Sequence, residues 1–424
     1  MSKTISVHRS GPLKGSIRVP SDKSLSHRSL IFAALAKTPS VIHNPLNSED
    51  CEATAHALSK MGHQIELGES VFRVTPGTWK SPESPLDCGN SGTTMRLLSG
   101  VIASRPEVKA TLVGDASLSK RPMGRIAKPL RLMGAGVEGE QAPLTITGTS
   151  LTGIEYTSPV ASAQIKSCIL LAGLNAEGTT AVTEPAQSRN HTELMLKALG
   201  VKVEVDHLTV KVEKAEWDGF EIHVPGDISS AAFWMAAASI VPGSNVTLTG
   251  VGTNPTRSGI LDVLKQSGAT FTESPENEEL GEPVSTLEIS HTDSLKPFTI
   301  EGGLVPRLID EIPVLAVLAT QCHGKTIIRD AAELKVKESD RIALVVDGLR
   351  KMGAHIEARE DGMEISGPTP LVGTEIHAQG DHRIAMSFAV AGLIAEGTTT
   401  IHGAESIATS YPDFEKHLHE LTQN

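Results

Sequence analysis

Cationic side chains recur where helices are expected to begin, and the chemistry open to them there is the binding of small anions. Lys23 and Arg28 lie in SDKSLSHR, Lys337 and Arg341 in KVKESDRIA, and Arg383 in GDHRIAMSF. Helix N-termini present unpaired N–H groups and the positive end of the helix dipole, so a cation there strengthens an anion site. The whole chain has a formal net charge of -12, which makes these segments local exceptions. We therefore expect an anionic ligand.

Two further segments fit the same chemistry. In CGNSGTTMR, Gly89 and Gly92 flank a loop whose backbone can approach a ligand closely. In SKRPMGR, Arg121 stands before Pro122, a favoured first helical residue, which predicts that the guanidinium lies at a helix mouth. Other cations have the simpler interpretation of solvated surface charge, and these are Lys120, Lys128, Arg131 and Lys335.

Carboxylates and histidines in these segments also allow a structural interpretation. Asp310 and Asp381 precede apolar runs and could simply be helix N-caps with no further role. We keep this interpretation for Asp381. His27 and His382 are expected to orient their neighbours. No HExxH pattern or Cys/His ligand spacing occurs, so we predict no metal and no cofactor.

Length and composition narrow the class of protein. A chain of 424 residues exceeds one compact core, so about two or three domains are expected. No apolar run approaches the roughly 20 residues that span a bilayer, no signal-peptide core opens the chain, and the cysteines lack CxxC spacing, which favours a cytoplasmic protein. The acidic charge and the 3% aromatic content argue against nucleic acid or membrane as a partner. Small polar substrates are the better hypothesis.

One helix-like apolar run recurs six times, at a spacing of roughly 70 residues. Each run opens with Ser or Asp, which are good N-cap residues, and a β-rich stretch follows it. A second, more amphipathic helix ends at a Gly in five copies, as in ALSKMGHQIE. The pattern predicts an α/β fold in which the apolar helices are buried against sheets. The runs begin at Ser24, Ser91, Ser162, Ser229, Asp310 and Asp381.

The first and fourth copies share the similar segments IRVPSDKSLS and IHVPGDISSA, which indicate two chain crossings. With three repeats in each lobe, residues 21–225 form a first lobe, and residues 1–20 with 226–424 form a second. The crossover segments lie near residues 20 and 226, and the active site is expected between the lobes. An open solenoid is the alternative, but the paired crossings favour two globular lobes.

Six motifs carry a resemblance that spans nearly the whole chain: RVPSDKSLSHR, DCGNSGTTMR, GDASLSKRPMGR, SAQIKSCILLAGL, LKVKESDR and GDHRIAMSF. In these segments the chain resembles the enolpyruvyl transferase family, in the branch that acts on 3-phosphoshikimate. The resemblance implies a two-lobed, inside-out α/β barrel fold with six βαβαββ-type units. It also implies transfer of the enolpyruvyl group of phosphoenolpyruvate to the 5-hydroxyl of 3-phosphoshikimate, in the shikimate pathway to chorismate and aromatic amino acids.

Two alternative functions stay open at this point. The sister branch acts on UDP-N-acetylglucosamine, but it carries a Lys-Asn pair where this chain has Lys23 and Ser24. It also usually has a reactive Cys in the loop that reads SLSKRPMGR here. The other alternative is a non-catalytic scaffold that binds phosphorylated metabolites. Asp310 and Glu338 argue against that scaffold, because a pure anion binder gains nothing from carboxylates beside its arginines.

The resemblance assigns residues to both substrates. For the chemistry we assign Asp310 as the base at the hydroxyl and Glu338 as the proton donor to C3 of phosphoenolpyruvate, with Lys23 assisting both. The residues expected to hold 3-phosphoshikimate are Lys23, Ser24, Arg28, Ser162, Ala163 through its backbone, Gln164, Arg189, Asp310 and Lys337. The residues expected around phosphoenolpyruvate, whose anionic groups suit guanidinium pairing, are Lys23, Gly92, Arg121, Gln164, Arg341 and Arg383.

Some positions depart from the family pattern. Many relatives have Lys where this chain has Thr409 and Asn where it has Glu333, which puts the family's ligand contacts there in question. Relatives that resist the inhibitor glyphosate often carry Ala at the position of Gly92, so Gly92 favours glyphosate binding. Leu97, where many relatives have Pro, weakens that inference. Arg189 resembles the substrate-binding arginine of the class II members, and a monomer is the family expectation.

Overall fold

The apolar runs of the sequence form six helices that are buried along most of their length. Helix α7 is buried at every residue, and its Ala, Ser and aromatic side chains leave no polar face. A helix that is apolar on every side needs cover on every side. The six helices are α1 (Lys23–Leu35), α3 (Gly92–Ala103), α5 (Ala163–Gly173), α7 (Ile228–Ile240), α10 (Ile312–Ala319) and α12 (His382–Gly392). The computed structural model describes residues 3–423.

Side-chain N-caps begin five of these six helices, and the caps are Asp22, Ser91, Ser162, Asp227 and Asp381. Two expected caps were wrong, because α1 and α7 are capped by the Asp that lies two residues before Ser24 and Ser229. Asp310 is not a cap of α10 either, since Glu311 borders that helix without a side-chain cap. The carboxylate of Asp310 is instead paired with cations.

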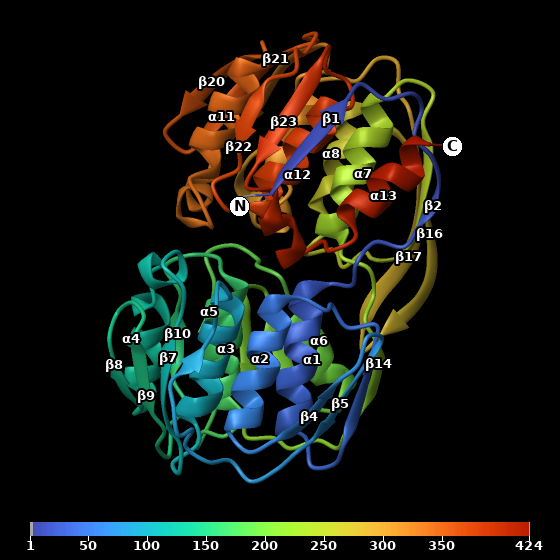
Figure 1. The fold of residues 1–424 in the computed structure, drawn as a ribbon. Coiled ribbons are helices and arrows are strands. Elements are labelled where there is room, and N and C mark those ends of the chain that lie inside the picture. Colours follow the sequence, from blue (N-terminus) through green and yellow to red (C-terminus); the bar gives the residue numbers. More distant parts are fainter. Residues whose placement is uncertain (1–2, 424) are drawn as a thin grey trace. The chain divides into compact units, whose positions relative to one another are not determined.

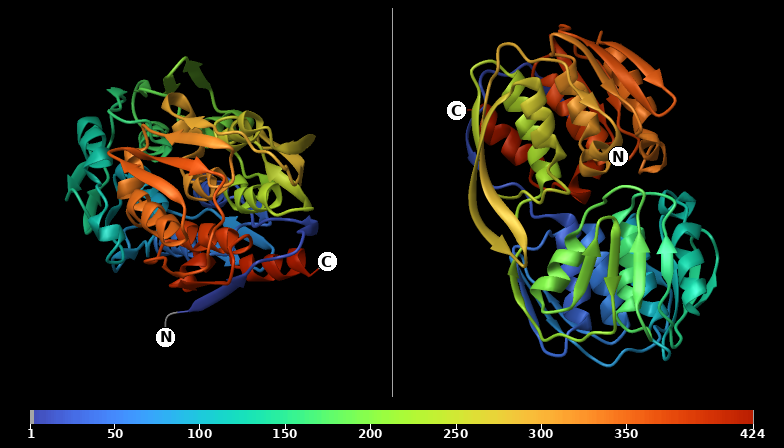
Figure 2. Two further views of the ribbon diagram at one scale, coloured as in Figure 1. Left: turned by 90° about the horizontal axis from the view of Figure 1, so that it is seen from above. Right: turned by 180° about the vertical axis from the view of Figure 1, so that it is seen from behind.

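Contacts divide the described chain into two units. The first unit consists of Ser21–Val224 with Glu278–Glu282, and the second consists of 3–20, Pro225–Asn277 and 283–423. The sequence did not indicate that Glu278–Glu282 belongs with the first unit. In each unit the sheets lie at the periphery and the apolar helices lie inside (Figures 1 and 2).

The first unit contains three four-stranded mixed sheets. Their strand orders are β14-β3-β5-β4, β6-β7-β9-β8 and β10-β11-β13-β12, with one parallel pair at the start of each order. The strands are β3 (Ser40–His43), β4 (Gln64–Leu67), β5 (Val71–Thr75), β6 (Leu86–Asp87), β7 (Lys109–Val113), β8 (Gly136–Glu138), β9 (Leu144–Thr147), β10 (Glu155–Thr157), β11 (Thr180–Thr183), β12 (Val203–Asp206), β13 (Thr209–Val212) and β14 (Glu221–His223). The more amphipathic helices are α2 (Glu49–Lys60), α4 (Gly124–Met133) and α6 (His191–Ala198).

The second unit repeats this plan with the orders β16-β17-β15-β2, β18-β19-β21-β20 and β1-β23-β22. Its strands are β1 (Thr4–His8), β2 (Lys14–Ile17), β15 (Asn245–Gly252), β16 (Thr270–Glu279), β17 (Glu282–Ser290), β18 (Thr299–Ile300), β19 (Gly324–Ile328), β20 (His355–Arg359), β21 (Gly362–Gly367), β22 (Glu375–His377) and β23 (Thr398–His402). Its other α-helices are α8 (Gly259–Ser267), α9 (Val305–Leu308), α11 (Arg341–Lys351) and α13 (Phe414–Thr422). Four 3-10 turns complete the described chain, namely η1 (Leu118–Lys120), η2 (Gly302–Leu304), η3 (Ala332–Val336) and η4 (Ala404–Thr409).

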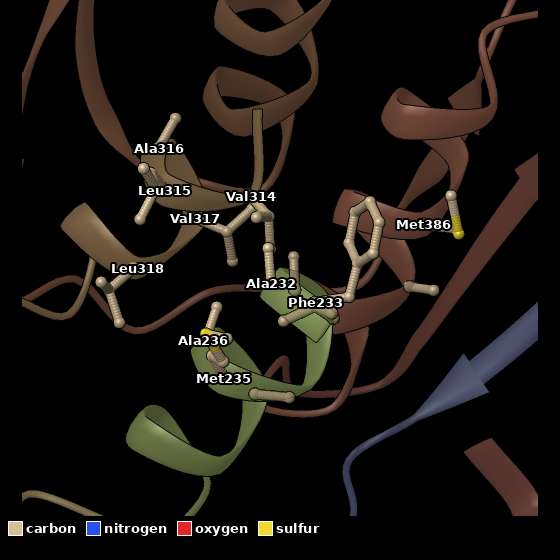
Figure 3. Close-up of a cluster of buried hydrophobic side chains, with 14 of the residues drawn as sticks. Ala232, Phe233, Met235, Ala236, Val314, Leu315, Ala316, Val317, Leu318 and Met386 are labelled. Carbon is tan, nitrogen blue, oxygen red and sulfur yellow. The ribbon is translucent and has the colours of Figure 1, made fainter. Parts of the chain in front are cut away.

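Each unit has its own hydrophobic core. In the second unit α7, α10 and α12 pack against one another, and side chains from all three helices, among them Phe233, Val314 and Met386, form a buried hydrophobic cluster (Figure 3). In the first unit α3 and α5 approach so closely that a Cβ at Gly100 would lie 2.1 Å from the carbonyl oxygen of Cys168. The six sheets and six buried helices confirm the prediction of six α/β repeats.

Within the described part of the chain, no helix is both long enough and apolar enough to cross a bilayer. All four cysteines are buried free thiols. Burial raises the pKa of Cys51, Cys88, Cys168 and Cys322 to about 12, so these thiols are poor nucleophiles.

Candidate active site

The start of α1 holds the first cation of the candidate site. Lys23 is the first residue of the helix, and Asp22 caps it by accepting a hydrogen bond from the backbone N–H of Leu25 at 2.8 Å. The Lys23 ammonium lies 2.9 Å from the Asp50 carboxylate, and both side chains are largely buried. The ammonium is thus held by a carboxylate while its side chain keeps 19% exposure.

Arg28, one turn further along α1, is almost fully buried, at 2% exposure. Its guanidinium donates to Thr192 Oγ1 and Ser167 Oγ at 2.9 Å, and to the carbonyl oxygen of Ser24 at 3.0 Å. Burial lowers the pKa of Arg28 to about 10, which still leaves the group charged near neutral pH. Its neighbour His27 bonds Thr54 at 2.7 Å, and burial lowers the pKa of His27 to about 3, so that imidazole is neutral.

The glycine-containing loop before α3 is tied to Arg121. The guanidinium donates to the Asn90 side-chain oxygen at 2.6 Å and to the Asn90 carbonyl oxygen at 3.2 Å. A Cβ at Gly92 would lie 3.0 Å from Arg96 Nη1 and 3.4 Å from Arg121 Nη1, so the missing side chain lets both guanidinium groups approach. The predicted helix mouth at Pro122 was wrong. Helix α4 begins only at Gly124, and Arg121 follows the short 3-10 turn η1.

Gln164, in the first turn of α5, connects that helix to α3. Its side-chain oxygen accepts a hydrogen bond from Arg96 Nη1, and its amide nitrogen donates to Thr93 Oγ1 at 2.9 Å. The sequence analysis assigned no role to Arg96, although it ends the motif DCGNSGTTMR. Its position four residues after Gly92, one helical turn away, was the signal that could have identified it.

A buried cluster of ion pairs involves Lys166, which lies near the N-terminal end of α5. Lys166 Nζ lies 2.8 Å from both Glu184 and Glu193, and all three side chains are at most 4% exposed. Glu184 also accepts hydrogen bonds from the backbone N–H groups of Ser162 at 3.1 Å and Ser188 at 3.4 Å. Lys166 therefore fixes the loop before α5 and the loop that carries Arg189. None of these three charged residues was predicted.

In the second unit, Arg341 is the centre of a cluster of charges. It is the first residue of α11 and is 1% exposed. Its guanidinium bonds three carboxylates: Asp381 at 2.8 Å, Asp310 at 3.0 Å and Glu338 at 2.6 Å. The prediction that Glu338 and Arg341 lie at a helix mouth agrees with these positions. Asp381 caps α12 as expected and in addition bonds Arg341.

Asp310 has a second cationic partner. Lys337 Nζ lies 3.3 Å from the same carboxylate oxygen that Arg341 contacts. Arg383, in the first turn of α12, donates to the Asp310 carbonyl oxygen at 3.2 Å and lies 3.7 Å from Glu311. The sequence thus predicted a group of residues that the fold brings together in this unit.

Electrostatics hold this cluster in its charged form. Burial disfavours the charge of Arg341, but the carboxylates of Asp381, Glu338 and Asp310 outweigh it and raise the pKa of Arg341 above its ordinary value. Burial likewise disfavours the Asp381 carboxylate, yet Arg341 keeps the pKa of Asp381 below its ordinary value. Asp310 is 12% exposed and Glu338 is 20% exposed, so both carboxylates retain some access.

The position of each remaining predicted residue is given by the unit and the element in which it lies. Ser24, Ala163 and Arg189 belong to the first unit at the starts of α1, α5 and α6, and all three are partly exposed. Glu333 lies in η3, and Thr409 is the last residue of η4, both in the second unit. The candidate site residues are therefore divided between the two units.

Fold and site together define the class of protein. The solved structure of the enolpyruvyl transferase NikO from Streptomyces tendae has the same fold, with a TM-score of 0.77 over 99% of this chain and 98% of that one at 19% identity. The solved EPSP synthase of Acinetobacter baumannii is more similar, with a TM-score of 0.89, 44% identity and coverage of 99% and 98%. The chain therefore has the enolpyruvyl transferase fold.

Sequence comparison gives the particular family. The family model of EPSP synthase (3-phosphoshikimate 1-carboxyvinyltransferase) matches residues 7–418. A 3-phosphoshikimate 1-carboxyvinyltransferase of Bacillus cereus is 51% identical over 97% of both chains, and one of Gloeothece citriformis is 50% identical over 97% of this chain and 94% of its own. The chain belongs to the EPSP synthase family, the transferases that carry out the 3-phosphoshikimate 1-carboxyvinyltransferase step of the shikimate pathway. The predicted family, fold and enzyme class are confirmed.

The buried cluster around Lys166 leads to a prediction of stability. Lys166→Met would leave two buried carboxylates without their cation, and breaking a buried pair costs about 3–5 kcal/mol. We expect the urea unfolding midpoint to fall accordingly. Lys37→Met is the matched control, because Lys37 pairs with Glu216 at an exposed site and should change the midpoint little. Equal effects of the two substitutions would contradict the structural role of Lys166.

Proposed function

We propose that this chain transfers the enolpyruvyl group of phosphoenolpyruvate to the 5-hydroxyl of 3-phosphoshikimate through the residues of the two groups described above. The observation that carries the proposal is the pair of carboxylates on one buried guanidinium: Asp310 and Glu338 both bond Arg341. An addition–elimination reaction at an enol carbon needs one group that accepts a proton and another that supplies one. Two partly accessible carboxylates beside anion-binding cations meet that need.

The proposed 3-phosphoshikimate site uses hydroxyl, amide and cationic groups. Its members are Lys23, Ser24, Arg28, Ser162, Ala163, Gln164, Arg189, Asp310 and Lys337. The bonds that Arg28 makes to Thr192, Ser167 and Ser24 support this assignment, because they hold its charge in a fixed place. The ties of Glu184 to the backbone of Ser162 and Ser188 support a preorganised loop at the same site.

The proposed phosphoenolpyruvate contacts are cationic except for one glycine and one amide. They are Lys23, Gly92, Arg121, Gln164, Arg341 and Arg383. The close approach of Arg121 to Gly92 supports this set, because a guanidinium beside a glycine-containing loop can pair an anion in bidentate fashion. Asn90 already orients Arg121, so little side-chain entropy would be lost on binding.

In the proposed chemistry, Asp310 takes the proton of the 5-hydroxyl while the hydroxyl oxygen forms a bond to C2 of phosphoenolpyruvate. Lys337 and Arg341 stabilise the ionised form of this carboxylate, which a base requires. Glu338 gives a proton to C3, which completes the tetrahedral adduct. In the elimination, the Glu338 carboxylate takes a proton back from C3 as the C2–O bond to phosphate breaks and the C2–C3 double bond re-forms. The leaving phosphate accepts the proton that Asp310 took from the hydroxyl. Lys23 assists both proton transfers.

The ion pair between Arg341 and Glu338 could change when phosphoenolpyruvate binds to Arg341. Glu338 is paired with Arg341 at 2.6 Å, and only the protonated form of Glu338 can donate a proton. An anionic group of phosphoenolpyruvate that takes over this guanidinium donor would weaken the pairing of Glu338 with Arg341. We infer that substrate binding and the acid form of Glu338 are coupled through Arg341.

Phosphate release tests the proposed function directly. The purified chain, with no metal added, should release phosphate from phosphoenolpyruvate when 3-phosphoshikimate is present and should not do so with UDP-N-acetylglucosamine. Release with UDP-N-acetylglucosamine alone would assign the chain to the sister activity. Release with neither alcohol would favour a binding scaffold.

Asp310→Asn tests the assigned base. The amide has the same shape but cannot accept the hydroxyl proton, and general acid–base groups typically contribute about 10²–10⁴-fold, so we expect kcat to fall by that order. Asp347→Asn is the control, because Asp347 pairs with Lys351 on the exposed side of α11 and should leave kcat unchanged. Near-normal turnover of Asp310→Asn, with its unfolding midpoint intact, would rule out the assignment.

Glyphosate binding follows from the family resemblance at Gly92. We expect glyphosate to inhibit phosphate release in competition with phosphoenolpyruvate. Gly92→Ala should weaken the inhibition, because its Cβ would meet Arg96 at 3.0 Å and displace the guanidinium groups by a few tenths of an ångström. Steady-state inhibition at varied phosphoenolpyruvate measures both effects. A lack of inhibition at millimolar glyphosate would remove this expectation.

A further inference from the structure

A cluster of two histidines and one glutamate lies on the sheet β1-β23-β22 of the second unit, outside the residues assigned to the reaction. Strands β22 and β23 run parallel, with Glu375 opposite Thr400 and His377 opposite His402. Side chains two residues apart on a strand point to the same face, so Glu375, His377 and His402 share one surface. One ligand atom from each lies within 4.8 Å of those of the other two. Among the described residues, only this group meets that condition.

The distances within the cluster are close to those of a metal site. The imidazole rings of His377 and His402 stack with their centroids 4.7 Å apart, and His402 Nε2 lies 3.8 Å from Glu375 Oε2. Ligand atoms around a tetrahedral zinc ion are about 3.3 Å apart, given Zn–N distances near 2.0–2.1 Å. Small side-chain rotations would bring these atoms to that spacing. His402 Nε2 is buried and makes no hydrogen bond in the described structure, so its lone pair or proton is unused.

The other nitrogen of His402 faces a neighbour that could orient the ring. His402 Nδ1 lies 3.4 Å from Thr4 Oγ1 on β1, the strand that pairs antiparallel with β23. A histidine that binds a metal through one nitrogen commonly uses the other for such an outer contact, which fixes its tautomer. Thr4 would leave Nε2 of His402 as the ligand atom.

The first unit repeats the same three residue types in the same register, but with a different outcome. Strand β14 pairs in parallel with β3, which places His223 opposite His43 and Glu221 two residues before His223. There the Glu221 carboxylate already contacts His43 Nε2 at 2.5 Å. His223 Nδ1 is 4.0 Å from a second carboxylate, that of Glu279. The nitrogen of the second unit that corresponds to His43 Nε2 is His402 Nε2, which lies 3.8 Å from Glu375 and makes no hydrogen bond within the described residues. This looser contact distinguishes the two copies.

We propose that Glu375, His377 and His402 bind a borderline divalent metal ion of the Zn²⁺ type. Imidazole and carboxylate ligands suit such ions, and a set of two His and one Glu leaves a fourth position for water. The ion would tie β22 to β23 and so stabilise the second unit, because a ligand that binds the native state raises its stability. The spacing of 25 residues between His377 and His402 hid this set from the sequence motifs considered above.

Zinc titration of the untagged, full-length, metal-free chain tests the proposal. We expect one tight equivalent of Zn²⁺ in competition with a chromophoric chelator, and a higher urea unfolding midpoint when Zn²⁺ is present. His402→Gln should remove both effects. Loss of an outer partner of a metal ligand typically costs about 10–100-fold in affinity, so loss of the ligand itself should cost about 100-fold or more.

His43→Gln is the matched control, because it alters the same position of the other copy and should leave the tight equivalent intact. Mg²⁺ should not compete, since it prefers oxygen ligands. Tight zinc binding that survives His402→Gln, or that disappears in His43→Gln, would overturn the proposal, as would weak binding that is equal in all three proteins. Phosphate release by the metal-free chain reports on the proposed catalytic function separately, because none of these residues is assigned to that reaction.

Discussion

A single buried guanidinium sets the geometry of the candidate site residues in the second unit. Arg341 is held by carboxylates from three separate segments: Asp310 before α10, Glu338 before α11 and Asp381 at the start of α12. Each of these charges would be costly alone in an apolar interior, and together they compensate one another. Because the partners come from different segments, the cluster also fixes where these helices begin relative to each other. The carboxylates of Asp310 and Glu338 are thereby placed by the same contacts that stabilise them.

The first unit adds hydroxyl and amide hydrogen bonds to its ion pairs at Lys23 and Lys166. Thr54 of α2 bonds Thr94 of α3, and Gln164 of α5 bonds Thr93 of α3. Arg28 of α1 reaches Ser167 of α5. These bonds connect residues in the first two turns of their helices, because buried helices have polar groups to satisfy chiefly near their ends. The buried helices are apolar along their length and polar near their N-termini. Their N-terminal ends therefore gather N–H groups, hydroxyls and cations.

The sequence predicts this architecture well because periodicity and caps are local properties. The six apolar runs, the terminating glycines and the cations beside the runs all follow from neighbours within a few residues. Pairing is not local, so the partners of Lys166, Arg96 and Asp310 could not be read from spacing. Arg121 shows the same limit: Pro122 suggested a helix start, but the chain first makes η1, and the guanidinium turns back to Asn90. Which cation meets which carboxylate is decided only when the helices pack.

The repeated strand motif shows how duplicated units acquire different chemistry on one backbone plan. EIH occurs in β14 and again in β22, and each copy pairs in parallel with a strand that ends in Ile-His. The register is the same, so the backbone imposes the same juxtaposition of two imidazoles and one carboxylate in both units. The copies differ in their carboxylate contacts. In the first unit Glu221 lies 2.5 Å from His43 and Glu279 lies 4.0 Å from His223, whereas in the second unit Glu375 stays 3.8 Å from His402. Different carboxylate placements on one backbone plan thus separate a close ion pair from the cluster that we propose as a metal site.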